Sequence, residues 1–184
     1  MRNIIDADVY DRQKRLSGWD QAAVSSSRCM VVGAGALGNE VVKSLVQLGV
    51  GEITLVDYDT IVPANLNRCA FFRQADEGEH KALVLAERAM ELNPDCKVTP
   101  VIKPVEKLGE NAFIGYTAVF SCLDNLAARL HTNAHSYGVA PLIDGGTSGF
   151  FGKVQVVRAP GPCLECPLTK RDYALMWRKY SCVG

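Results

Sequence analysis

Apolar residues in this chain fall either into short continuous runs or into longer stretches with helical spacing. The predicted strands are residues 28–32, 53–56, 98–102, 118–122 and 141–144. Residues 98–102 are marked by β-branched side chains, and residues 118–122 form a continuous apolar run that suits a strand buried on both faces of a sheet. The stretches with apolar side chains three and four positions apart are residues 39–48, 79–92 and 124–137. This spacing predicts amphipathic helices between the strands.

The alternation of strands and helices predicts an α/β fold, Rossmann-like, with a mostly parallel sheet and helices on both faces. Residues 153–157 alternate less regularly and predict an added antiparallel strand. From residue 160 the chain changes character, with prolines, a CxxC and clustered charge. We therefore expect residues 1–160 to form one domain and residues 161–184 to begin a second unit.

Composition narrows the class of protein without naming a function. The 184 residues are 48% hydrophobic and balance 20 basic against 20 acidic side chains, so the basic excess typical of nucleic-acid binding is missing. No apolar run approaches the roughly 20 residues of a membrane span, and the first residues lack the apolar centre of a signal peptide. An odd number of cysteines, seven, favours a reducing compartment over a disulfide framework. We expect a cytoplasmic protein.

A glycine turn follows the first strand. Gly33, Gly35 and Gly38 lie between that strand and the first long helix, where backbone N–H groups can bind a phosphate. Asp57 ends the second strand, where a carboxylate can hold ribose hydroxyls. Taken alone, these residues predict an NAD-dependent dehydrogenase as readily as any other nucleotide-binding protein.

Cationic side chains beyond the turn favour a different chemistry. Arg68 follows residues 65–67, and Lys81 opens the second long helix. A site that adenylates a carboxylate must neutralise a triphosphate and align the attack on its α-phosphate. Asp124, after a buried strand, could hold Mg²⁺ through oxygen. An oxidoreductase would need a substrate-side acid or base and would not need Lys81.

Seven motifs in order carry a resemblance to a known family. They are Tyr10-Asp11-Arg12-Gln13, the glycine turn, Val56-Asp57-Tyr58-Asp59, Asn65-Leu66-Asn67-Arg68, His80-Lys81, Cys122-Leu123-Asp124-Asn125 and Cys163-x-x-Cys166. Over residues 8 to about 168 this set resembles the adenylation domain of the ubiquitin-activating enzyme superfamily. That superfamily includes the adenylyltransferases of molybdopterin and thiamine biosynthesis.

The resemblance implies a role for each matched residue. The implied contacts to ATP come from the glycine turn, from Asp57 at the ribose, and from Asn65, Arg68 and Lys81 at the phosphates. Asp124 would coordinate Mg²⁺. Asp59 either belongs to the ATP site or caps the turn that follows it. Arg12 resembles the arginine that reaches into the partner subunit's ATP site, which implies a homodimer or pseudo-dimer. Cys69 departs from the family, which usually has glutamine there.

Cysteines near the end of the chain carry two further expectations from the resemblance. Cys163 and Cys166 resemble half of a structural Zn²⁺ site, and the chain has no second CxxC to complete four ligands. Either the chain is a fragment, or the other half lies elsewhere. Cys182 resembles the cysteine that forms a thioester with the modifier, and the basic residues around it favour its thiolate.

The expected function is ATP-dependent adenylation of the C-terminal glycine of a ubiquitin-like modifier, followed by thioester formation on Cys182 and transfer to a conjugating enzyme. One alternative is an adenylyltransferase for a sulfur-carrier protein. Another is a non-catalytic subunit of a heterodimeric activating enzyme, which should lack some of Arg68, Lys81 and Asp124. We expect no nucleic-acid or membrane partner.

Overall fold

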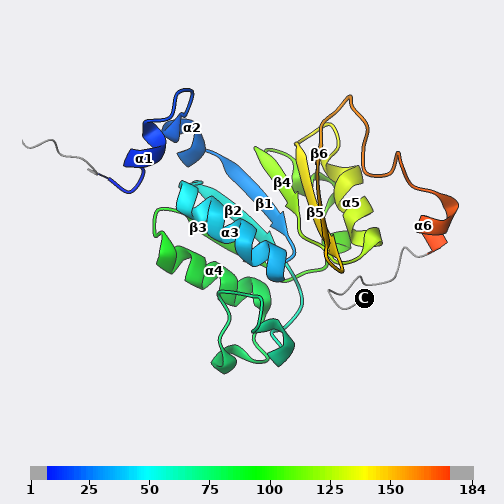
Figure 1. The fold of residues 1–184 in the computed structure, drawn as a ribbon, viewed down its shortest axis with the longest axis horizontal. Helices are drawn as coiled ribbons and strands as arrows, with labels where there is room; N and C mark the ends of the chain where they lie inside the picture. Colours follow the sequence, from blue (N-terminus) through cyan, green and yellow to red (C-terminus); the bar gives the residue numbers. More distant parts are fainter. Residues whose placement is uncertain (1–7, 175–184) are drawn as a thin grey trace, which may run out of the picture.

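The computed structural model describes residues 8–174 and contains a six-stranded sheet in the order β3-β2-β1-β4-β5-β6 (Figure 1). The strands are β1 (Arg28–Val32), β2 (Glu52–Val56), β3 (Lys97–Val101), β4 (Ala118–Ser121), β5 (Leu142–Ser148) and β6 (Phe151–Val157). The first five pair in parallel, and β6 pairs with β5 antiparallel. The predicted mostly parallel α/β fold is confirmed, together with its antiparallel addition.

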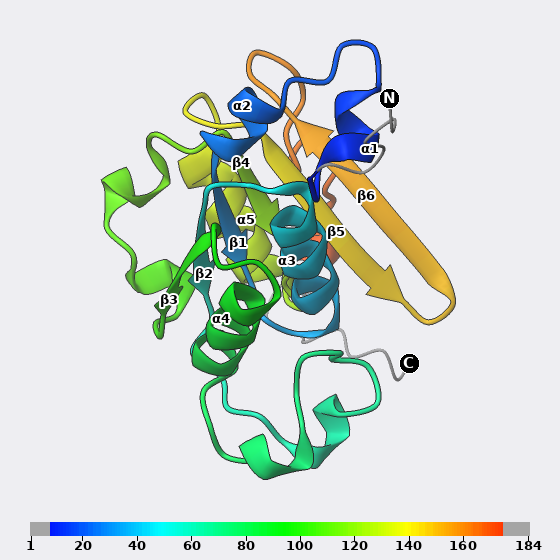
Figure 2. The same ribbon diagram turned by 90° about the vertical axis from the view of Figure 1, so that its left-hand side faces the viewer.

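Helices cover both faces of the sheet. Helices α3 (Ala36–Leu48) and α4 (Lys81–Leu92) lie on one face, and α5 (Leu126–Ser136) lies on the other with the 3₁₀ turns η3 (Val105–Lys107) and η4 (Glu110–Phe113) (Figure 2). The shorter elements are α1 (Asp11–Lys14), α2 (Gln21–Ser25), η1 (Pro63–Asn65), η2 (Gln74–Asp76) and α6 (Lys170–Ala174). None of the helices within residues 8–174 is long and apolar enough to cross a membrane.

Strand β1 explains why the apolar runs are continuous. Cys29 and Val31 point into the core beneath α3 and α4, whereas Met30 and Val32 point into the core beneath α5. Successive side chains of a strand face opposite sides, so a strand covered on both faces has no polar side. The edge strand β3 contains Pro100, which an edge position tolerates because a neighbouring strand is missing on one side.

Several boundaries differ from the predicted ones by one to four residues, and two of these differences bear on the site. Helix α3 begins at Ala36 with Gly35 as its N-cap, so Gly38 lies inside the helix and not in the turn before it. Strand β5 continues to Ser148 and is thus longer than the predicted run to Asp144. The extension is stabilised by hydrogen bonding to β6. Residues 145–148 have no apolar pattern from which this part of the strand could be predicted.

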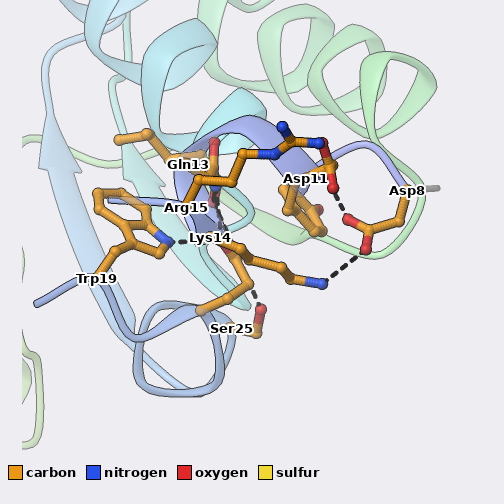
Figure 3. Close-up of polar contacts among 10 residues, drawn as sticks. Asp8, Asp11, Gln13, Lys14, Arg15, Trp19 and Ser25 are labelled. Atoms are coloured by element: carbon orange, nitrogen blue, oxygen red, sulfur yellow. Dashed lines mark hydrogen bonds and ion pairs between the residues drawn. The ribbon is translucent and has the colours of Figure 1, made fainter. Parts of the chain in front are cut away.

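The N-terminal segment packs against the C-terminal end of α3. Figure 3 shows Gln13 among the polar side chains of this segment. The side-chain amides of Gln13 and Gln21 each donate to the carbonyl oxygen of Leu48 at 3.0 Å. The last carbonyl groups of a helix have no partner inside it, so these bonds satisfy one of them. This contact places α1 at the end of α3 that lies away from the glycine turn.

Part of the predicted second unit is attached to the first. Leu164 is buried in the core beneath α5, and its N–H donates to the side-chain oxygen of Asn133 at 3.2 Å. The boundary near residue 160 stays a prediction. Cys182 lies outside the described residues.

Candidate functional site

A cavity of about 540 Å³ opens at the carboxyl ends of the parallel strands. The chain runs outward from β1 to β2 and β3, then crosses to β4 on the other side of β1. Open α/β sheets bind ligands where the strand order reverses in this way. The predicted residues that line the cavity are Gly33, Gly35, Asp57, Asp59, Asn65, Arg68, Lys81 and Asp124. Residues from five separate motifs therefore meet at one site.

The glycines of the turn serve different steric needs. Gly33 has a φ of +100°, and a Cβ there would lie 2.6 Å from the carbonyl oxygen of Cys122, the residue after β4. A Cβ at Gly38 would overlap the carbonyl oxygen of Gly33, so the helix can approach the turn only without a side chain. Gly35 has open space on its Cβ side, toward the cavity. The first N–H groups of α3 thus face a space in which an anion can bind.

Asn39 fixes the turn from inside the helix. Its side-chain nitrogen donates to the carbonyl oxygens of Ala34 and Gly35, both at 3.0 Å, and its oxygen accepts from the N–H of Phe71 at 3.1 Å. The side chain is fully buried. Sequence reasoning missed this residue. The available signal was its position on the same helix face as the buried Val42 and Val46, where a polar side chain needs partners.

Asp57 connects the turn to the end of β2. One carboxylate oxygen accepts from the N–H of Ala34 at 2.6 Å, and the other accepts from the N–H of Asp59 at 2.8 Å. Burial raises the pKa of Asp57, although these hydrogen bonds act in the opposite direction. Each carboxylate oxygen can accept a second bond. A ribose hydroxyl could therefore add to the existing contacts without breaking them.

Lys81 and Asp59 form an ion pair at the mouth of the cavity. The Lys81 Nζ lies 3.0 Å from Oδ2 of Asp59, and the N–H of Lys81 donates to the Asp59 carbonyl oxygen at 3.0 Å. The Lys81 side chain is 12% exposed and that of Asp59 is 41% exposed. Asp59 thus holds the lysine in place whether or not it also contacts a ligand.

Arg68 and Asn65 make local contacts within their own loop. Nη1 of Arg68 donates to Oδ1 of Asn67 at 2.9 Å and to the carbonyl oxygen of Ala64. The Asn65 side-chain oxygen accepts from the N–H of Val62 at 3.0 Å. Both residues line the cavity. Both printed bonds come from Nη1, so Arg68 keeps further N–H donors on its guanidinium for phosphate oxygens.

Asp124 stands on the opposite wall, between β4 and α5. The next residue, Asn125, caps α5 by accepting from the N–H of Ala128 at 2.8 Å. This cap fixes the backbone beside Asp124, whose exposed carboxylate lines the cavity. Carboxylate oxygens are the ligands that Mg²⁺ prefers, so the donor set fits the predicted ion.

Cys163 and Cys166 lie together, outside the cavity. Their sulfur atoms are 3.7 Å apart, and the N–H of Cys163 donates to the Cys166 sulfur at 3.3 Å. Burial raises the pKa of Cys163, but hydrogen bonds from the Glu165 backbone, Asn133 and Cys166 outweigh it, so the pKa lies below its usual range. Within residues 8–174, no group of three or more His, Cys, Asp or Glu side chains could hold a metal ion.

Arg12 is not brought to this cavity. It belongs to α1, which packs at the Leu48 end of α3, whereas the Gly35 end of α3 faces the cavity. The 13 residues of α3 span about 20 Å.

The sheet topology and the glycine turn define an α/β protein of the Rossmann-like class. The ThiF family matches residues 10–179, and the chain belongs to that family.

Curated relatives extend this result. The chain is 37% identical over 152 residues to the Saccharomyces cerevisiae protein named ubiquitin-activating enzyme E1-like. It is 36% identical over 147 residues to SUMO-activating enzyme subunit 2 of Dictyostelium discoideum. It is 35% identical over 155 residues to the Nedd8-activating enzyme E1 catalytic subunit of Drosophila melanogaster. These matches cover 80%, 78% and 76% of this chain but 23%, 22% and 34% of the relatives. The chain therefore corresponds to a minor part of each.

A solved structure supports the fold. The *E. coli* MccB structure with succinimide superimposes with a TM-score of 0.73 and 22% sequence identity, over 84% of this chain and 47% of MccB.

Proposed function

We propose that this protein uses ATP to adenylate the C-terminal glycine of a ubiquitin-like protein. The observation that carries the proposal is the meeting of Arg68, Lys81 and Asp124 with the glycine turn in one cavity. A dinucleotide site needs the glycine turn and the ribose-binding acid. A triphosphate with Mg²⁺ additionally needs cations and a second acid, which Arg68, Lys81 and Asp124 supply. The named relatives, which include three E1-type proteins, support the same reaction class.

In the proposed reaction each group of residues has a separate role. The turn holds the phosphates, Asp57 holds the ribose, and Asp124 is positioned to hold Mg²⁺, which neutralises phosphate charge when bound. The substrate carboxylate forms a bond to the α-phosphorus, and the bond from that phosphorus to the departing pyrophosphate breaks. Arg68 and Lys81 stabilise the negative charge that accumulates on the leaving pyrophosphate.

ATP–pyrophosphate exchange tests this reaction directly, using the complete protein with any partner subunit and a panel of proteins that end in glycine. Exchange that depends on one of those proteins supports adenylation and identifies the substrate, including whether it is a sulfur carrier. We expect Lys81→Ala to lower the exchange rate by about 100-fold or more. Lys97→Ala, an exposed lysine at the start of β3, serves as the matched control. Lack of exchange with every candidate, despite ATP binding, would favour the non-catalytic subunit.

The second step assigns Cys182 as the nucleophile. Its thiolate attacks the carbonyl carbon of the acyl-adenylate, a thioester forms and AMP leaves; a conjugating enzyme would accept the product. We expect Cys182→Ala to retain pyrophosphate exchange and to lose the thioester, detected on a non-reducing gel. A thioester that persists in this variant would contradict the assignment.

Arg12 is proposed to act on the cavity of a second subunit, because its helix lies at the far end of α3 from its own. In a homodimer, mixing Arg12→Ala with Asp124→Asn chains would restore one intact site in each mixed dimer, or about a quarter of wild-type sites overall. No recovery after subunit exchange would exclude this arrangement, and a pseudo-dimer would instead need the arginine from a different chain.

Cys163 and Cys166 are proposed to supply two of four Zn²⁺ ligands. Two thiolates bound to one tetrahedral Zn²⁺ lie about 3.8 Å apart, given Zn–S bonds of about 2.3 Å. The observed 3.7 Å fits this spacing. The sequence holds no second CxxC, so the other two ligands would have to come from other residues or from another chain. Metal analysis of the complete protein, with and without Cys163→Ser, tests the site, and equal zinc content would disprove it.

A further inference from the structure

The loop between β2 and α4, residues 57–80, brings two of the residues proposed to bind ATP to the cavity, Asn65 and Arg68. It contains the 3₁₀ turns η1 and η2 and lies below α4 in the view of Figure 1. A bridge between Thr60 and His80 joins its two ends. Long loops are the parts of a protein in which several conformations are common. The position of Arg68 therefore depends on what holds the middle of the loop.

Arg88 holds the middle of this loop from helix α4. Its Nη1 and Nη2 each donate to a carboxylate oxygen of Asp76 at 2.6 Å, and Nη1 also donates to the carbonyl oxygen of Phe71. The Arg88 side chain is 25% exposed and that of Asp76 is 12% exposed. A two-point contact of this kind fixes the plane of the guanidinium. Arg88 thus attaches two separate points of the loop to α4.

Phe71 is held from two helices at once. Its carbonyl oxygen accepts from Arg88 on α4, and its N–H donates to the side-chain oxygen of Asn39 on α3 at 3.1 Å. Asn39 also fixes the glycine turn. Arg88 follows Lys81 by about two turns of the same helix. The backbone of Phe71 is therefore fixed relative to both the turn and the lysine.

Backbone hydrogen bonds connect this fixed point to Arg68. The N–H groups of Arg68 and Cys69 donate to the carbonyl oxygen of Asn65 at 3.1 and 3.0 Å. The N–H of Phe72 donates to the carbonyl oxygen of Cys69 at 3.1 Å. Residues 65–72 thus form consecutive tight turns with little freedom between them. A displacement of Phe71 would consequently displace the backbone of Arg68.

We propose that Arg88 is a positioning residue, which holds the loop so that Arg68 lies beside Lys81 and both can bind the β- and γ-phosphates of ATP. This inference rests on the proposed function. Among residues 8–174, Arg88 is not part of the cavity lining, so it acts through the loop and not on the ligand. Asn39 keeps its bonds to the glycine turn when Arg88 is replaced, so the binding of a ribose and an α-phosphate should not depend on Arg88.

The measurement is equilibrium binding of ATP and of AMP, each with Mg²⁺, to the complete protein with any partner subunit. We expect Arg88→Ala to weaken ATP binding about tenfold and to leave the Kd for AMP within about twofold. Arg88→Lys keeps the charge, but one ammonium group cannot reproduce the fork, so it should show a smaller loss that is equally selective for ATP.

Val98→Ala is the control for a loss of stability alone. Val98 is 3% exposed near the amino end of β3, away from the cavity lining. Its truncation should lower the Tm, because it leaves a cavity in the core. The ratio of the Kd for AMP to the Kd for ATP should nevertheless stay within about twofold of the wild-type ratio, since the loop keeps its contacts.

A double-mutant cycle with Arg68 separates positioning from a general effect on the fold. In a protein that already carries Arg68→Ala, adding Arg88→Ala should weaken ATP binding by less than about twofold, because the residue that Arg88 positions is gone. The full effect in that background, equal losses for ATP and AMP, or an unchanged Kd for ATP in both Arg88 variants would each overturn the inference. Substrate-dependent ATP–pyrophosphate exchange by the wild type would leave the proposed function standing in those cases. No such exchange by the wild type overturns both.

Discussion

Replacing Asn39 with alanine tests whether the glycine turn is held by this one side chain. The substitution removes three hydrogen bonds from a fully buried position. Gly35 keeps a partner, since its carbonyl oxygen also accepts from the Asn39 backbone N–H. The carbonyl oxygen of Ala34 and the N–H of Phe71 lose the bonds that Asn39 supplied. At about 1 kcal/mol net for each bond, with the added cost of unsatisfied buried groups, unfolding free energy should fall by about 2–4 kcal/mol.

The assay is thermal unfolding followed by circular dichroism, together with ATP affinity. For a chain of this size the loss corresponds to a fall in Tm of about 4–16 °C. ATP binding should weaken as well, because Asn39 fixes the backbone that faces the cavity. Asn111→Ala, at an exposed position in η4, is the control and should stay within about 1 °C of wild type.

Asn39→Asp separates the effect of the lost hydrogen bonds on stability from the effect of the lost side-chain volume. Aspartate keeps an acceptor for Phe71 but presents a buried negative charge to two carbonyl oxygens, so it should destabilise at least as much as alanine near neutral pH. A Tm for Asn39→Ala within about 2 °C of wild type would refute the reasoning.

Two further predictions concern packing and pH. Gly38→Ala should lower the unfolding free energy by about 1–3 kcal/mol and weaken ATP binding, because its Cβ would overlap the carbonyl oxygen of Gly33. Urea unfolding and ATP titration check this prediction, and wild-type values in both would contradict it. Burial, and then the stacked ring of His135, lower the pKa of His131, while Glu106 acts against the shift. The unfolded chain therefore binds this proton more readily, and the stability that the neutral ring gives above its ordinary pKa is lost as the pH falls through the lowered value. We expect His131→Gln to reduce the fall in Tm between about pH 7.5 and about pH 5, and an equal fall in both proteins would argue against this role.

The periodicity of the chain was enough to predict the central sheet and its long helices, because strands covered on both faces leave uninterrupted apolar runs. It did not predict α1 and α2. Helices of four and five residues are too short to form alone. They depend on contacts such as those from Gln13 and Gln21 to Leu48, between residues far apart in the sequence.

Sequence motifs also predicted which side chains meet in the cavity, but not the bonds that hold them there. Nothing in the order of residues indicates that Asp57 binds the N–H of Ala34, or that Lys81 pairs with Asp59. Asn39 and Arg88 were missed for a related reason. Their importance lies in partners brought close by the fold, and neither belongs to a motif with a characteristic spacing.

These contacts divide the residues proposed to bind ATP into two groups. The turn is already bonded to the end of β2 through Asp57 and to helix α3 through Asn39, so binding a ribose and an α-phosphate there requires little rearrangement. Lys81 and Arg68, by contrast, already have partners, and each has to share or exchange them in order to contact a phosphate. The difference in affinity between AMP and ATP therefore measures the net gain from that exchange. It should be smaller than two unpaired cations would give, because Asp59 and the loop oxygens around Arg68 already satisfy part of each cation before the β- and γ-phosphates bind.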